Sequence, residues 1–196
     1  MKEGESGIVS LSDEELMLRV KGDSPCAFEE LVRRYQKRVI NIAYRFTSEE
    51  SASEDVAQEV FCRLWEHRRS YVPSARFSTF LYRVTANFCI SEYRSQRRRQ
   101  EVHIERKEEE ADFEFPSEES SPQSGVERGE LEEKVKSAVA ALPESQRMAV
   151  ILSRYEGLSY VEIAEVMGTT VEAVKSLLVR ARVSLKERLS RFLKEK

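Results

Sequence analysis

The chain has 196 residues and a formal net charge of −3, with 40% apolar and 34% charged side chains. That length allows one ordinary domain or two small ones, and the near-neutral total does not suggest a nucleic-acid partner. No apolar run is longer than five residues, whereas a membrane-spanning helix needs about 20, so we expect no membrane insertion. The three cysteines are widely spaced and lack the pattern of a zinc site or a disulfide framework. We therefore expect a cytoplasmic protein with no metal and no cofactor.

Charge is segregated along the chain. Residues 63–99 carry nine basic and two acidic side chains, a net charge of +7, and residues 175–196 carry eight and two, a net charge of +6. The intervening residues 96–130 have a net charge of −5. Two basic segments are thus separated by an acidic one, a pattern that the total charge conceals and that needs a cause.

Residues 101–130 indicate a flexible acidic linker, because Glu, Ser and Pro occur there without apolar periodicity. The linker divides the chain into an N-terminal domain, residues 1–100, and a C-terminal domain, residues 131–196. No glycine lies between Gly22 and Gly125, which disfavours a fold rich in β-hairpins. The predicted fold class is all-α, with two small helical domains joined by the linker.

Four helices are expected in the N-terminal domain. A capping box that begins at Ser12 starts a short first helix. Apolar residues recur at helical spacing over 28–46 and predict the second helix. Ser53 or Asp55 is expected to open the third helix, and the fourth starts at about Ser78.

The C-terminal domain contains a predicted helix-turn-helix. Pro143 is expected to start one helix, a capping box at Ser159 starts a short helix that stops at Gly168, and a box at Thr169 opens a long basic helix. A short capped helix, a glycine turn and a basic helix together favour DNA binding over a plain helical hairpin with a solvated face. The residues of the long helix expected to reach bases and phosphates are Thr170, Glu172, Lys175, Ser176, Arg180 and Arg182.

The other basic segment, residues 63–99, is interleaved with aromatic residues. Proteins that stack unpaired bases use this combination, although aromatic residues at helical spacing are more often part of a core. The stretch 67–77 is therefore better placed to hold an extruded base. No pattern of a catalytic or metal site is present, so we do not expect an enzyme.

Three motifs together resemble a known family. They are EDVAQEVF at 54–61, FSTFLYRVTAN at 77–87, and EGLSYVEIA at 156–164. This combination is similar to bacterial RNA polymerase sigma factors of the extracytoplasmic-function (ECF) group of the sigma-70 family. The resemblance implies that the N-terminal domain binds core RNA polymerase and reads and melts the −10 promoter element, and that the C-terminal domain reads the −35 element.

The resemblance also assigns residues and partners. Core polymerase binding would involve Asp55, Gln58, Glu59, Arg63 and Trp65. Recognition of the −10 element would involve Arg76, Phe77, Phe80, Arg83, Asn87, Arg94, Arg97 and Arg98. The implied partners are core RNA polymerase, promoter DNA and an anti-sigma factor that holds the protein inactive.

The sequence departs from the family pattern at three positions. The family usually has Trp where Phe80 stands, Asp where Ser91 stands and often Arg where Leu177 stands. Because Leu177 cannot make the contact of that Arg, we assign the −35 contacts to Lys175, Ser176 and Arg180 in particular. The alternative interpretation is a helix-turn-helix repressor or activator that does not bind core polymerase, and a helical adaptor for acidic proteins is a third. The repressor or activator does not account for residues 54–65 or for the aromatic and basic segment, and salt-sensitive binding to promoter DNA would reject the adaptor.

Overall fold

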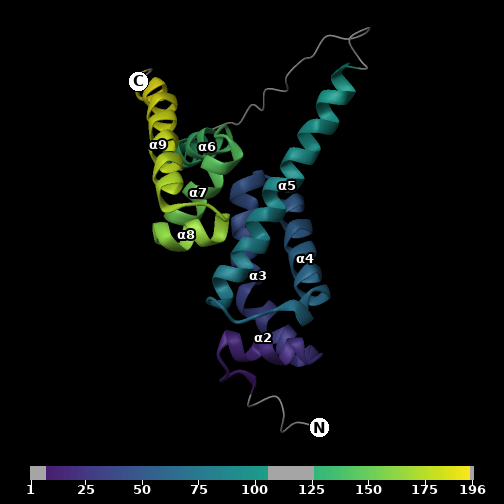
Figure 1. Ribbon diagram of the computed structural model, residues 1–196. Coiled ribbons are helices and arrows are strands. Elements are labelled where there is room, and N and C mark those ends of the chain that lie inside the picture. Colours follow the sequence, from purple (N-terminus) through teal and green to yellow (C-terminus); the bar gives the residue numbers. More distant parts are fainter. Residues whose placement is uncertain (1–7, 106–125, 195–196) are drawn as a thin grey trace.

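The computed structural model describes residues 8–105 and 126–194, with side chains described for 8–99 and 133–190. Every regular element within these residues is helical (Figure 1). The elements are α2 (Asp13–Lys21), α3 (Pro25–Thr47), α4 (Glu50–Glu66), the short 3₁₀ helix η1 (Arg68–Ser70), α5 (Phe77–Glu105), α6 (Val126–Ala140), α7 (Glu144–Arg154), α8 (Tyr160–Met167) and α9 (Val171–Lys194). The predicted all-α class is confirmed.

Helices α2–α5, the N-terminal body, pack around one apolar core. Its centre is formed by fully buried side chains such as Leu31, Phe46, Val60 and Leu81. On each helix the buried apolar residues recur at helical spacing, so each helix turns one apolar face inward. The last turns of α5 extend away from the rest of the body (Figure 1).

Helices α6–α9, the C-terminal body, contain the predicted helix-turn-helix, formed by α8 and α9. Ser159 and Glu162 form a reciprocal capping box at the start of α8. Gly168 ends α8 in the left-handed conformation, with φ of 61°, which glycine adopts at no steric cost. The turn between the two helices is therefore built by the residues that the sequence suggested.

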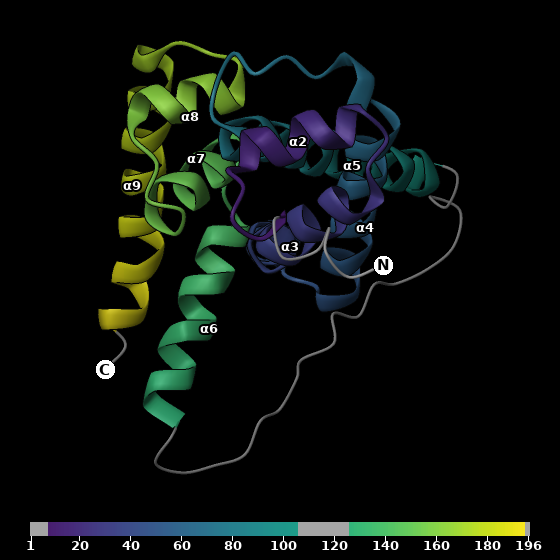
Figure 2. The ribbon, with the colours of Figure 1, turned by 90° about the horizontal axis from the view of Figure 1, so that it is seen from below.

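The two bodies lie against one another in this structure. Figures 1 and 2 show α6–α9 on one side of α2–α5, with α8 beside α5 and α7 beside α3. The hydrophobic cluster is continuous across this contact, from Phe46 in α3 to Met148 and Ile151 in α7.

Two expected helix starts need correction. Helix α4 begins at Glu50, so neither Ser53 nor Asp55 opens it; Ser53 is buried and its hydroxyl donates to the Glu50 carbonyl at 2.6 Å. The box predicted at Thr169 is also wrong, because the hydroxyl of Thr170 accepts from the Ala173 amide at 3.2 Å.

The ends of the predicted linker are helical. Helix α5 runs to Glu105 and α6 begins at Val126, so helices extend into both edges of residues 101–130. Residues 106–125 lie outside the described part of the chain.

Candidate functional site

The outer face of α9 carries the predicted duplex-reading residues. Thr170, at its N-terminus, and Glu172, Lys175, Ser176, Arg180 and Arg182 are all exposed. The opposite side of the helix holds Val174 and Ala181, both fully buried against the body. The apolar stripe therefore fixes the rotation of α9 and presents the polar residues as one set to solvent.

The predicted −10 residues divide between surface and core. Arg83, Asn87, Arg97 and Arg98 are exposed along α5, as are Arg76, just before it, and Arg94. Phe77 is fully buried, with its ring 5.3 Å from the ring of Tyr35. The ring of Phe80 is half-buried and lies 5.3 Å from Tyr71. Phe77 is thus a core residue in this structure, and the loop before α5 offers other groups to a base.

The predicted polymerase-binding residues line two grooves that flank the solvent-facing side of α4. Gln58 and Trp65 line a groove between α3 and α4 with a volume of about 700 Å³. The walls of this groove are mainly apolar, because Phe28, Val32, Ile40 and Phe61 contribute to them. Such a groove can accept the apolar face of a partner helix.

The other three residues of this set line a second groove, of about 790 Å³, between α4 and α5. These residues are Asp55, Glu59 and Arg63. Arg63 pairs with Glu59 at 2.7 Å, and its guanidinium lies 4.6 Å from the centre of the Phe88 ring. The five residues therefore share the solvent-facing side of α4 but line two different grooves beside it.

Polar contacts join α5 and the residue before it to α7, to α8 and to the loop between these two helices. Arg94 pairs with Glu144 at 2.9 Å, and Arg76 lies 3.7 Å from Glu162. The hydroxyl of Tyr82 donates to Glu156 at 3.1 Å. Burial, with the nearby Glu156 carboxylate, raises the pKa of Tyr82 to about 12. Two of the predicted −10 arginines are thus engaged by carboxylates of the C-terminal body.

Hydrogen bonds lower the pKa of two of the carboxyls that take part in these contacts. Its own backbone amide and then Arg94 lower the pKa of Glu144. The Ser159 cap, first through its amide, lowers the pKa of Glu162. Both carboxylates are therefore charged near neutral pH and attract the arginines that face them.

One contact between the bodies was missed by the sequence analysis. Arg147 of α7 is only 4% exposed. Its guanidinium donates to the carbonyl of Phe46 in the other body at 2.6 Å, and also to the carbonyls of Leu142 and Ala140. It lies 5.0 Å from the ring centre of Phe46 and 4.8 Å from that of Tyr93. A single Arg on an otherwise buried helix face is the only sequence signal that could have indicated this role.

Comparison with known proteins gives two family matches. Residues 31–99 match Sigma-70 region 2, and residues 132–185 match Sigma-70, region 4. No helix of the described residues is long and apolar enough to cross a membrane.

Curated relatives and a solved structure agree with these matches. The RNA polymerase sigma-H factor of Pseudomonas aeruginosa is 32% identical over 93% of this chain and 96% of the relative. The ECF RNA polymerase sigma-E factor of Escherichia coli K12 is 32% identical over 94% of this chain and 97% of the relative. CnrH, solved in complex with the cytosolic domain of CnrY, is 25% identical with a TM-score of 0.67, over 91% of this chain and 97% of CnrH. The chain therefore belongs to the ECF group of sigma-70 family RNA polymerase sigma factors.

Proposed function

We propose that this protein binds core RNA polymerase and directs promoter-specific transcription initiation by reading a −35 duplex and −10 non-template bases. It acts by binding, in the cytoplasm, and not by catalysis. The observation that carries the proposal is the row of exposed polar residues on α9, set behind a capped helix and a glycine turn, in a chain similar to sigma factors over nearly its full length.

Helix α9 supplies the −35 contacts in this proposal. Lys175 and Arg180 are donors that suit the acceptors of guanine in the major groove, and Ser176 can serve as donor or acceptor. The N-terminus of α9, at Thr170, offers backbone amides to a phosphate. Phosphate contacts position the helix, and base contacts make it selective.

The −10 element is read by α5 and by the loop before it. Arg83, Arg97 and Arg98 are exposed and can neutralise phosphates, and Asn87 can bond a base edge. Extruding a base costs a few kcal/mol, which these contacts and base stacking must offset. We assign the stacking to the loop of residues 67–76 and the half-buried Phe80, since Phe77 is part of the core.

Core polymerase binds α4, and we assign the main contact to the apolar groove that Trp65 and Gln58 line. The aromatic walls of this groove have the composition of an interface hot spot. Asp55, Glu59 and Arg63 would then contribute polar contacts at the other side of α4.

An anti-sigma factor is a further proposed partner. The arrangement seen here engages Arg76 and Arg94 with Glu162 and Glu144, so promoter DNA has to replace these contacts. A protein that stabilises this arrangement would keep the −10 face covered. CnrH, which is similar to this chain, was solved in complex with the cytosolic domain of CnrY.

The assignment of α9 is tested by the double variant Lys175→Ala, Arg180→Ala. Each lost base contact weakens specific DNA binding by about 1–3 kcal/mol, so dependence of transcription on the −35 element is expected to disappear. Affinity for core polymerase, measured with labelled protein, stays unchanged. The control is Lys186→Ala, an exposed lysine of the same helix outside the predicted set. Equal loss of polymerase binding in the double variant contradicts the assignment.

A further inference from the structure

Helix α2 holds the loop between α4 and α5 at both of its ends and in its middle. The carboxylate of Asp23, two residues after the end of α2, pairs with Arg68 at 2.6 Å and with Arg69 at 3.0 Å. The ammonium of Lys21 donates to the carbonyl of Tyr71 at 2.8 Å. Helix α2 precedes residue 31, where the match to Sigma-70 region 2 begins.

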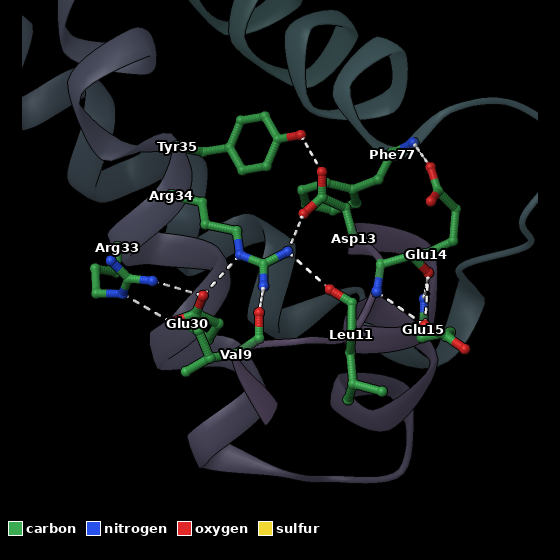
Figure 3. Close-up of polar contacts among 11 residues, drawn as sticks. Val9, Leu11, Asp13, Glu14, Glu15, Glu30, Arg33, Arg34, Tyr35 and Phe77 are labelled. Carbon is green, nitrogen blue, oxygen red and sulfur yellow. Dashed lines mark hydrogen bonds and ion pairs between the residues drawn. The ribbon is translucent and has the colours of Figure 1, made fainter. Parts of the chain in front are cut away.

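The third contact lies at the start of α5. A carboxylate oxygen of Glu14 accepts a hydrogen bond from the backbone amide of Phe77 at 2.8 Å (Figure 3). The first amides of a helix have no partner within the helix, so Glu14 caps α5 from an element 63 residues earlier in the chain. Its charge also interacts favourably with the positive end of the helix dipole.

Helix α2 is itself held firmly against α3. Figure 3 shows the guanidinium of Arg34 among several acceptors. It donates to Asp13 at 2.8 Å, to Glu30 at 2.7 Å, and to the carbonyls of Val9 at 2.7 Å and Leu11 at 2.9 Å. The buried side of α2 also packs into the core. Because α2 is held in place by these contacts, it can fix the position of the loop residues that it contacts.

The loop needs an external support. Residues 72–76 are exposed, and Val72 is 67% exposed, so little packing orders them. We propose that α2 sets the shape of this loop, and that Glu14, Lys21 and Asp23 are positioning residues for base selectivity at one position of the −10 element. They act through Phe77, Tyr71 and the two arginines of η1. This inference rests on the proposed function.

Variants of α2 and of Asp23 distinguish a role in positioning the loop from a role in the stability of the whole fold. Glu14→Ala and Lys21→Met remove the hydrogen bonds to the loop, while Glu14→Gln and Lys21→Arg keep an acceptor and a donor in place. Asp23→Asn removes the charge and tolerates the positive φ of 64° at this exposed position.

Two exposed residues of α3, Glu29 and Lys37, provide matched controls. The structure shows no hydrogen bond or ion pair for either side chain among the described residues. Glu29→Ala and Lys37→Met change the same charges as the α2 variants without touching the loop. Any effect that they share with those variants reflects charge alone.

The experiment uses the full chain with purified core polymerase and a promoter library randomised over the −10 and −35 elements. For Glu14→Ala with Lys21→Met, we expect preference at one −10 position to fall about tenfold, as expected for the loss of one or two hydrogen bonds. Preference at −35 and polymerase affinity stay unchanged. Glu14→Gln with Lys21→Arg restores most of the preference, and Asp23→Asn lowers it in part.

The inference is overturned if transcription falls uniformly across the library, or if every preference is unchanged. Asp23→Asn keeps the test decisive where the double variant does not fold, because its side chain lies at the surface; unchanged preference in it then refutes the proposal. Failure of the proposed function has a different signature, since the unmodified protein would then select no promoter from the library at all.

Discussion

Arg147 is the contact between the two bodies whose removal has the clearest expected effect. The substitution Arg147→Met keeps a long side chain of similar shape in a site that is 4% exposed but removes every donor. It breaks the 2.6 Å bond to the Phe46 carbonyl and the cation–π contacts to Phe46 and Tyr93. We expect the bodies to separate more easily.

The magnitude follows from these contacts. A hydrogen bond from a charged group contributes about 1.5–3 kcal/mol, and cation–π contacts contribute about 0.5–2 kcal/mol. The share that crosses between the bodies is therefore about 2–5 kcal/mol. At about 1.4 kcal/mol per tenfold, the ratio of separated to packed molecules rises by roughly 30-fold to a few thousand-fold.

Energy transfer between dyes on α4 and α9 measures this change. One dye is placed on the exposed Cys62 and the other on an introduced Lys186→Cys, with Cys26→Ser removing the other exposed thiol. Burial raises the pKa of Cys89 to about 12, so this thiol does not compete for the dye.

Urea is added to find the concentration at which the bodies separate, and circular dichroism confirms that the helices persist. The midpoint of separation falls in Arg147→Met and not in Arg154→Met, which alters an exposed arginine of the same helix. An unchanged midpoint in Arg147→Met would refute the reasoning.

Two further predictions concern α4 and α3. Trp65→Ala should weaken core polymerase binding by about 30-fold or more, as for a hot-spot residue, with DNA binding unchanged; an effect no larger than that of Lys37→Ala would move the interface elsewhere. Hydrogen bonds from Arg33 and then Arg34 lower the pKa of Glu30 from 4.5 to about 2. Its stabilising effect is therefore present above pH 4.5 and lost as the pH falls toward 2. Glu30→Gln should flatten this part of the pH dependence of the unfolding free energy. An unaltered profile would show that the Glu30 carboxylate does not contribute in this way.

Local signals in the sequence were sufficient to predict the helix-turn-helix. The caps at Ser159 and Gly168 involve residues close together in the chain, and the exposed face of α9 follows from helical periodicity alone. Adjacent threonines are harder to separate, because Thr169 and Thr170 have the same capping chemistry, and the structure uses Thr170.

Contacts between distant segments could not be predicted in this way. Glu14 and Phe77 are 63 residues apart, and Arg147 and Phe46 are 101 apart; both pairs depend on backbone groups, whose partners no side-chain motif specifies. The burial of Phe77 depends on where α2 and α3 pack. For the same reason, the motif at 54–61 identified α4 but not which of its residues share a groove.

Transcription reconstituted from purified components tests the central claim most directly. Core RNA polymerase is supplied with a set of promoter fragments from the source genome, with and without this protein, and transcripts are mapped to their start sites. We predict that defined start sites appear only when the protein is present. A protein that binds these fragments but yields no new start site with core polymerase would contradict the account and favour a helix-turn-helix repressor or activator.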